Sequence, residues 1–410
     1  MARGAGGPVY VPYALAGESV EADVSGERAV MTALLTPSPA RVTPLCPYFT
    51  VCGGCAVQHL RSAEYAAWKR GSLVTALAHA GVTCEVSPLI DARGEGRRRA
   101  TFHARAQTRG SSGAPDAGFM RARSHEIIAI DACPVLVPAL APALGAARAL
   151  AKALAHLGKP LDCVATATLS GIDIDLRGTG KIDEATRKKL TALAGEFDLA
   201  RISLHGEIIL ARRDPALRMG AAEVIPPPGG FIQATARAEE ILSGIALEAC
   251  KGAARTGDFF SGLGTFALRL MALAPVLAVE SDAAALAALS RAARSARAPH
   301  PVEILARDLF RQPLAGAELA GLEAVVFDPP RAGAQAQAQA FAASDIRTIV
   351  AISCNAASFS RDAAILISGG YALESVTPVD QFVFSPHVEI AAVFRRKSVT
   401  KRGGRKSLLG

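Results

Sequence analysis

At 410 residues the sequence is too long for one ordinary domain, so we expect two or three. Half of the residues are apolar and 20% are charged, which excludes a disordered chain. The net charge of +8 favours a polyanionic partner such as RNA, DNA or an anionic membrane, although a merely basic soluble protein has the same balance.

The sequence contains no run of 18 apolar residues, and its first eight residues lack the apolar core of a signal peptide. We therefore expect a cytoplasmic protein with no membrane partner. In that compartment the eight cysteines should serve as metal ligands, nucleophiles or buried thiols before they form disulfides.

The first 45 residues predict a short module. Residues 9–12 and 18–24 are strand-like, and prolines follow at 37, 39 and 44. A small β-barrel fits this pattern, although the piece is short for a complete one.

The next segments change in character twice. Residues 46–59 are rich in cysteine and glycine and predict a loop, and 63–80 predict an amphipathic helix. Residues 96–220 alternate apolar and polar side chains, with one Ala/Leu-rich helix near 137–157, and predict a mixed, mainly antiparallel domain.

Strands and helices alternate after the Pro/Gly run at 226–230, which predicts an α/β domain with a doubly wound, mainly parallel sheet. The helices are expected at 236–251, 265–273 and 282–297. The strands are expected at 254–260, 275–280, 302–306, 323–327, 347–352, 371–377 and 388–395. The tail from Arg395 carries seven Lys and Arg residues and should be flexible.

A glycine turn at 257–265 follows a predicted strand and opens a helix, so the backbone can approach a ligand there. Glu280 ends the next strand, where a carboxylate can bind both ribose hydroxyls, and Asp308 follows the third strand, where it could bind an adenine amino group. A tight turn with surface acids is the alternative. Because the turn is not a G-x-G-x-x-G fingerprint, S-adenosylmethionine is favoured over a dinucleotide.

Two further motifs follow strands of the same sheet. Asp328-Pro329-Pro330-Arg331 follows one strand, and Ser353-Cys354-Asn355 ends the next. Because ligands bind at the carboxyl ends of such strands, we expect Asp328 and Cys354 to face one crevice. A rigid turn and a buried structural cysteine are the alternatives.

His387 and Glu389 follow an irregular loop and could supply the base in a reaction at C5 of uracil. Uracil C5 is a poor nucleophile, but addition of a thiolate at C6 makes it enolate-like, and a base must later remove its proton. Cys354 fits the nucleophile, and either Glu389 or His387 fits the base.

Cys46, Cys52 and Cys55 lie close together, and Cys133 lies far downstream. Four thiolates can hold zinc or an iron–sulfur cluster, and this spacing suits a [4Fe–4S] cluster better than two close pairs would. Cys84, Cys163 and Cys250 lack such a context, so we expect them to be structural.

Together, these residues resemble the RNA (uracil-5-)-methyltransferase family, in its iron–sulfur branch. The resemblance runs from about Val9 to Arg396 and also includes Phe231-Ile232-Gln233 and Cys52-Gly53-Gly54-Cys55. The chain departs from the family pattern in its short N-terminal module and at three positions. Ser261 stands where Cys is common, and Ala356 and Val383 stand where the family usually has proline.

The resemblance implies a Rossmann-like class I methyltransferase domain with a truncated TRAM-like (OB-like) β-barrel and an α+β iron–sulfur domain. The implied parts are a barrel at 1–45, a central RNA-binding domain at 46–63 and 96–225, a catalytic domain at 64–95 and 226–396, and a basic tail at 397–410. Cys46, Cys52, Cys55 and Cys133 would ligate the cluster, with Cys354 as nucleophile and Glu389 as base. The cofactor and uracil sites would be lined by Gln233, Phe260, Thr265, Glu280, Asp308 and Asp328.

We therefore expect a monomeric enzyme that makes 5-methyluridine in 23S rRNA. Methylation of the tRNA T-loop is the alternative, followed by a non-catalytic RNA-binding protein. A nicotinamide-dependent oxidoreductase would leave Ser-Cys-Asn unexplained. Base flipping is expected, and Arg97, Arg98, Arg99 and the tail are candidate phosphate contacts.

Overall fold

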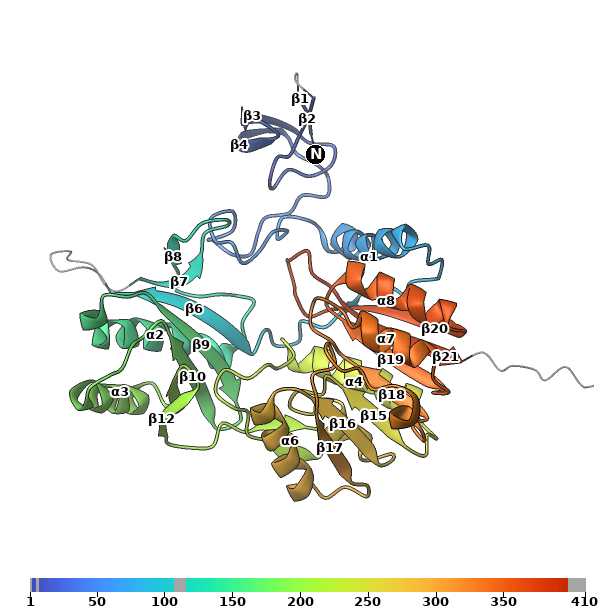
Figure 1. The fold of residues 1–410 in the computed structure, drawn as a ribbon. Helices are drawn as coiled ribbons and strands as arrows, with labels where there is room; N and C mark the ends of the chain where they lie inside the picture. The colour runs from blue at the N-terminus through green and yellow to red at the C-terminus, as the bar shows by residue number, and fades with distance from the viewer. Residues whose placement is uncertain (1, 5–6, 107–115, 397–410) are drawn as a thin grey trace, which may run out of the picture.

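The computed structural model describes residues 2–4, 7–106 and 116–396, so the predicted basic tail at 397–410 lies outside the described residues. A small N-terminal module and two larger lobes make up the described chain (Figure 1). None of its helices is both long and apolar enough to cross a membrane.

The N-terminal module consists of two antiparallel strand pairs. β1 (Ala2–Gly4) pairs with β2 (Gly7–Val9), and β3 (Ser19–Ser25) pairs with β4 (Arg28–Thr36). These pairs are separate two-stranded sheets, so the described part of the module is not a closed barrel and the predicted barrel is not confirmed. Several apolar side chains of the β3–β4 pair remain exposed as a result, among them Val30 at 71%.

The central lobe is a mixed sheet covered by two helices. Its described strands follow the order β12-β11-β10-β9-β6-β7-β8, in which only β10 and β11 are parallel neighbours. The strands are β6 (Arg99–Arg105), β7 (Asp116–Met120), β8 (Ile127–Ala129), β9 (Leu161–Thr168), β10 (Gly171–Arg177), β11 (Leu199–Leu204) and β12 (Glu207–Ala211). The helices are α2 (Ala141–Ala153) and α3 (Glu184–Glu196).

The sequence predicted only the first of these helices. α3 carries charged residues and threonines with few large apolar ones, so its helical period is weak, and it buries only Thr186, Leu190 and Ala194. Its start is nevertheless well defined, because the Asp183 side chain accepts a hydrogen bond from the backbone N–H of Thr186.

The second lobe is the α/β domain, with described strands in the order β17-β16-β15-β18-β19-β21-β20-β5. The first five strands in this order, from β17 through β16, β15 and β18 to β19, run parallel to one another. β21 lies between β19 and β20 and is antiparallel to both. The strands are β5 (Ile90–Asp91), β15 (Thr256–Phe259), β16 (Val276–Glu280), β17 (Val302–Ala306), β18 (Ala324–Phe327), β19 (Thr348–Ser353), β20 (Tyr371–Asp380) and β21 (Glu389–Arg396). A two-stranded sheet of β13 (Leu217–Met219) and β14 (Ala222–Val224) precedes it in the chain.

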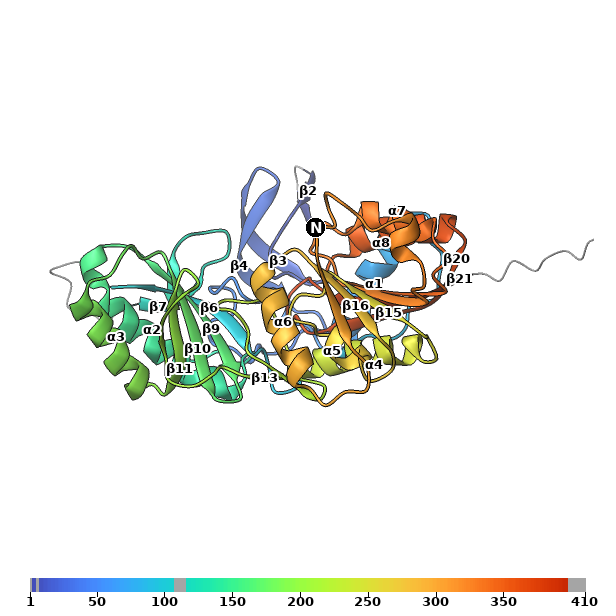
Figure 2. The ribbon, with the colours of Figure 1, turned by 60° about the horizontal axis from the view of Figure 1, so that its bottom comes forward.

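Helices cover both faces of this sheet, as a doubly wound fold requires (Figure 2). One face carries α4 (Ala236–Cys250), α5 (Ala267–Leu270) and α6 (Ala283–Ser295), and the other carries α7 (Gln335–Ala342) and α8 (Ala356–Ser368). α5 is shorter than the predicted 265–273, because hydrogen bonds between residues three apart, such as Arg269 to Phe266, form tight turns around it.

A segment from the other end of the chain completes this lobe. α1 (Ser62–His79) lies beside α8, and its Leu73 and Leu77 are buried in the same core as α7 and α8 (Figure 1). β5 then adds to the sheet edge, parallel to β20.

A buried ion pair fixes α1 to the sheet. Lys69 donates hydrogen bonds to the Asp380 carboxylate and, at 3.0 Å, to the carbonyl oxygen of Phe382. The Tyr65 hydroxyl donates to the other Asp380 oxygen at 2.6 Å. Lys69 and Asp380 are only 1% and 2% exposed, so each charge depends on the other in place of water.

We expect Lys69→Met to lower the free energy of unfolding of this lobe by about 3–5 kcal/mol, because it leaves the Asp380 carboxylate buried without its cation. Urea unfolding followed by the fluorescence of Trp68, the only tryptophan, would measure the loss next to the altered residue. Arg61→Met is the control, since the Arg61–Glu64 pair is exposed and its loss should leave the transition unchanged. Equal behaviour of the two variants would contradict this account of the ion pair.

Candidate active site

The carboxyl ends of the parallel strands open onto a cavity of about 560 Å³. Its lining contains all eight residues predicted for the catalytic and cofactor sites, which span more than 150 positions in the chain: Gln233, Phe260, Thr265, Glu280, Asp308, Asp328, Cys354 and Glu389. The cavity also includes Pro227 and Phe231 from the segment that joins the two lobes.

One end of the cavity is formed by the glycine turn after β15. The backbone N–H of Gly262 donates to a Glu280 carboxylate oxygen at 3.0 Å, which ties the turn to the end of β16. Gly264 has φ +89°, and a Cβ at this position would lie 2.3 Å from the Leu289 side chain. Only glycine therefore fits there, and it lets the chain turn closely against α6.

Two aromatic rings stand beside this turn. The ring centroids of Phe260 and Phe310 are 5.4 Å apart, and Phe310 is half exposed. Asp308 holds the loop after β17, because its carboxylate accepts from the backbone N–H of Phe310 at 2.9 Å. Phe310 was missed by the sequence analysis, since nothing distinguishes one exposed phenylalanine before the loop is placed.

The thiol of Cys354 enters the cavity at the junction of β19 and α8. The next residue, Asn355, caps α8 by accepting from the backbone N–H groups of Ala357 and Ser358. Its side-chain amide also donates to the carbonyl oxygen of Arg331 at 3.1 Å. The Asp-Pro-Pro-Arg and Ser-Cys-Asn motifs are thus held together.

Two carboxyl groups share the cavity with this thiol. Burial raises the pKa of Asp328 to about 7, and burial together with the Asp328 charge raises the pKa of Glu389 well above its usual range. Burial and both carboxylates raise the pKa of Cys354, while the Arg331 guanidinium lowers it. Each proton in this group therefore depends on the charge of the others.

A chain of two amides joins the carboxyl groups. Gln233 donates to Asp328 at 2.9 Å, and Gln381 donates to Gln233 at 2.7 Å and to Glu389 at 2.6 Å. Gln381 lies in the irregular loop before Glu389 and was not predicted, because no pattern in the sequence signals its contacts.

His387, the competing candidate for the base, lies elsewhere in this loop. It is absent from the described lining of the cavity, its ring packs against Phe382, and its Nε2 lies 3.4 Å from the Arg331 guanidinium. The fully enclosed Glu389 is the acid that faces Cys354 across the cavity.

A second cavity, of about 150 Å³, lies between the cysteine loop and the central sheet. Cys46, Cys52, Cys55 and Cys133 all line it, together with Arg97. All eight cysteines of the sequence are described and are free thiols. Within the described residues, no three His, Cys, Asp or Glu side chains converge closely enough to bind a single metal ion.

This arrangement fits a cluster, whose thiolate ligands bind different iron atoms and so surround a volume. The Cys52 sulfur accepts a hydrogen bond from the Gly54 N–H at 3.4 Å, and the Arg97 guanidinium lies close enough to interact electrostatically with Cys55 and Cys133. Burial nevertheless raises the pKa of Cys52, Cys55 and Cys133, the last to about 11, and the Gly54 N–H at Cys52 and the Arg97 guanidinium at Cys55 act in the opposite direction. A bound cluster would have to displace these thiol protons.

The three arginines predicted as phosphate contacts are not free on the surface. Arg98 is buried and pairs with Glu239 of α4, so its assignment as a phosphate contact was wrong. Arg97 lines the cysteine cavity, and Arg99 donates to the carbonyl oxygen of Gly229 at 2.9 Å. Position along the chain could not reveal that Arg98 and Arg99 point toward the other lobe and its linker, and Arg97 into the cysteine cavity.

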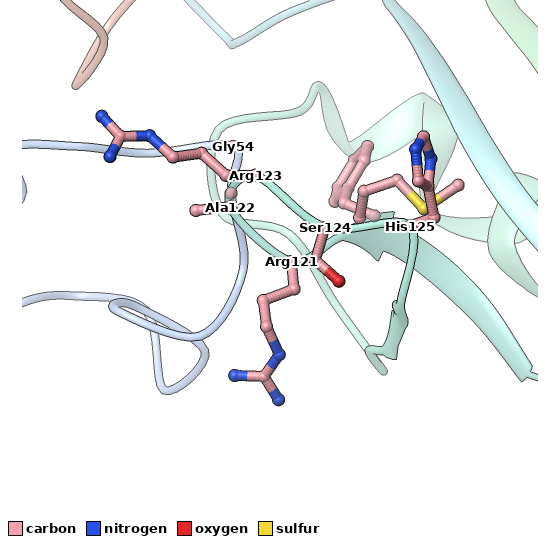
Figure 3. Close-up of a pocket in the computed structure, with 9 residues that line it drawn as sticks. Gly54, Arg121, Ala122, Arg123, Ser124 and His125 are labelled. Atoms are coloured by element: carbon pink, nitrogen blue, oxygen red, sulfur yellow. The ribbon is translucent and has the colours of Figure 1, made fainter.

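An open hollow of about 500 Å³ lies beside the cysteine loop, lined by Gly53, Gly54 and residues 119–125. The side chains of Arg121 and Arg123 point in different directions from it (Figure 3). Arg121 is paired with Glu126, and the Arg123 guanidinium lies over the Tyr10 ring. These two cations therefore do not converge on one ligand.

Known proteins similar to this chain are RNA methyltransferases. No family model matches the sequence. An RNA methyltransferase of Brucella suis is 46% identical over 95% of this chain and 93% of its own length. The 23S rRNA (uracil(1939)-C(5))-methyltransferase of Pseudomonas putida is 36% identical over 94% of this chain and 88% of its own.

A solved structure matches nearly the whole fold. The tRNA (uracil-54, C5)-methyltransferase of Pyrococcus abyssi, in complex with S-adenosyl-L-homocysteine, aligns with a TM-score of 0.71. The alignment covers 94% of each chain at 22% identity. This likeness establishes a common fold, including the α/β domain.

The electrostatic coupling around Cys354 predicts opposite effects of two substitutions. Glu389→Gln removes a negative charge and should lower the pKa of the thiol, whereas Arg331→Gln removes a positive charge and should raise it. At a fixed pH near 8.5, alkylation of Cys354 by iodoacetamide should therefore become faster in the first variant and slower in the second, by roughly 3- to 10-fold.

Mass spectrometry of the Cys354 peptide would follow the reaction, with the half-exposed Cys84 of the same lobe as internal reference. A parallel change at both cysteines would indicate altered folding and would overturn the electrostatic explanation.

Proposed function

The chain belongs to the RNA (uracil-5-)-methyltransferase family, and from this premise we propose that it methylates C5 of a uridine in 23S rRNA with S-adenosyl-L-methionine. One observation carries the proposal: the Cys354 thiol, the buried Glu389 carboxyl group and the glycine turn after β15 all line one cavity. The named relative of P. putida, which acts on 23S rRNA, supports this target over tRNA.

The residues at the glycine-turn end of the cavity suit an adenosine group. Glu280 and Asp308 stand at the ends of neighbouring strands, where carboxylates can accept from ribose hydroxyls and an amino group. Phe260, Phe310 and Thr265 supply apolar and hydroxyl contacts around them. S-adenosyl-L-methionine supplies an electrophilic methyl group when bound.

Cys354 and Glu389 divide the work on the pyrimidine. The Cys354 thiolate forms a bond to C6, and the electron pair of the C5–C6 double bond makes C5 nucleophilic. After C5 has gained the methyl group, Glu389 removes the C5 proton, the double bond re-forms and the bond from sulfur to C6 breaks. His387 is not assigned as the base, because it is absent from the described lining of the cavity that contains Cys354 and Glu389.

The target base must leave its stack to reach Cys354, so we infer base flipping from folded or single-stranded RNA. The central lobe, with the N-terminal module and the cysteine loop, would hold the RNA around that base. The boundaries of these parts are proposed as 1–45, 46–63 with 96–225, and 64–95 with 226–396.

The four-cysteine cavity is proposed to hold a [4Fe–4S] cluster through Cys46, Cys52, Cys55 and Cys133. The cluster would join the cysteine loop to the segment after β8 (Ile127–Ala129) and so stabilise the RNA-binding side of the molecule. No step of the methyl transfer is assigned to it.

Labelled S-adenosyl-L-methionine should methylate C5 of a uridine in unmodified 23S rRNA, and Cys354→Ala should abolish the transfer. Glu389→Gln should lower turnover by about 10²- to 10⁴-fold, because the C5 proton stays in place. It should also accumulate a covalent RNA–protein complex, visible on a denaturing gel.

Unmodified tRNA is the parallel substrate in that assay. Label in tRNA alone would keep the chemistry and replace the target. Label in neither RNA, with the methyl donor still bound, would favour an RNA-binding protein without this activity.

Protein purified without oxygen should be brown and contain about four irons per chain. Cys133→Ser should lose the iron, since it removes the ligand that joins the loop to the central sheet. Cys163→Ser is the control, because Cys163 is fully buried in β9 and absent from the described lining of the cavity, so this variant should keep the iron. Stoichiometric zinc in place of iron would contradict the assignment.

A further inference from the structure

The side chain of Gln381 has only one possible orientation. It is 1% exposed, and its Oε1 accepts a hydrogen bond from the backbone N–H of Ala234 at 2.8 Å. Because a backbone N–H can only donate, the atom that faces it must be the amide oxygen. The amide nitrogen of Gln381 therefore points to the opposite side.

That nitrogen sets the direction of the remaining hydrogen bonds. It donates to Gln233 Oε1 at 2.7 Å and to Glu389 Oε2 at 2.6 Å, so both of its N–H groups are used. Since Gln233 must present its oxygen to Gln381, its nitrogen faces Asp328, to which it donates at 2.9 Å. Gln233 keeps one N–H for an acceptor in the cavity, such as a carbonyl oxygen of a pyrimidine.

We propose that Gln381 is a positioning residue, which holds Glu389 as a hydrogen-bond acceptor and turns the N–H groups of Gln233 toward Asp328 and the substrate. The proposal rests on the proposed function of this cavity. It adds a residue that is absent from the described cavity lining and that acts through two side chains, Gln233 and Glu389, which would contact the target base.

The charge state of the base depends on this contact. Burial and the Asp328 charge raise the pKa of Glu389, and the hydrogen bond from Gln381 lowers it. The other ionisable groups around it are Asp328 after β18, Cys354 after β19 and Arg331, which faces Cys354. The uncharged Gln381 amide donates to Glu389 and so lowers the pKa that burial and the Asp328 charge raise.

Replacing the amide by a side chain of similar length removes the donor without opening a large space. In Gln381→Met, Glu389 loses its hydrogen bond, so its pKa should rise and the base should become ionised only at higher pH. The acid limb of the pH profile for single-turnover release of tritium from uridine labelled at C5 should therefore move to higher pH, because Glu389 acts after the methyl group has been transferred. Near neutral pH the rate should fall by about 10- to 100-fold.

Binding of S-adenosyl-L-homocysteine, measured by calorimetry, should stay unchanged, because Gln381 is absent from the described cavity lining that carries the nucleoside residues. Gln337→Met is a matched control. Gln337 is equally buried at 1% and bonds both backbone groups of Leu314, but it lies between α7 and a loop far from the amide chain. It should leave the pH profile in place.

Gln381→Glu is the second variant, used also if the methionine variant does not fold. It can still accept from Ala234, but it places a carboxylate against Glu389, so it should move the acid limb upward at least as far. An active wild type with unshifted profiles in both variants would overturn the positioning role. A wild type that transfers no methyl group to RNA would instead overturn the proposed function.

Discussion

The carboxylate of Asp380 lies where α1 meets the end of β20 and the loop that follows it, and the geometry of the active site depends on this contact. Asp380 ends β20 and binds Lys69 and Tyr65 of α1, while the Tyr65 hydroxyl accepts from the backbone N–H of Phe384 at 2.9 Å. These contacts fix the start of the loop that leads to Glu389. Phe384 has φ +60°, a strained conformation that a free loop would rarely keep. A buried charge without its partner would cost several kcal/mol, so the loop has few alternative positions.

The same loop connects the active-site cavity with the cysteine loop. The carbonyl oxygen of Phe384 accepts from the backbone N–H groups of Ala56 and Val57, directly after the last clustered cysteine. A change in the cysteine loop can therefore reach Gln381 and Glu389 through backbone contacts alone. The proposed four-cysteine centre would thus reach the active-site loop through the backbone, without any electron transfer.

The sequence predicted the carboxyl-end residues of the sheet because a parallel sheet brings those ends to one edge, whatever lies between them. Glu280, Asp328 and Cys354 could thus be placed together from strand order alone. The seven strands predicted for this lobe after residue 226 agree with the structure, but α7 and α8, which lie between the later ones, were not predicted. Gln381 and Lys69 could not be identified, because their partners lie 148 and 311 positions away and their roles depend on side-chain packing. α3 was not predicted, because its apolar residues show only a weak helical period. α5 was predicted too long, because tight turns form around it.

Buried ion pairs connect the two lobes, although apolar contacts alone could have held them together. Glu239 of α4 accepts from Arg98 of the central lobe and from Arg269 of α5. Arg269 also donates to the carbonyl oxygen of Thr265, in the glycine turn. Since buried ion pairs demand a particular geometry more than they add stability, this set fixes the angle between the lobes. The Glu239 carboxylate therefore connects the lobe that would hold RNA to the turn that would hold the methyl donor. A displacement of one of these parts would move the hydrogen-bond partners of the other.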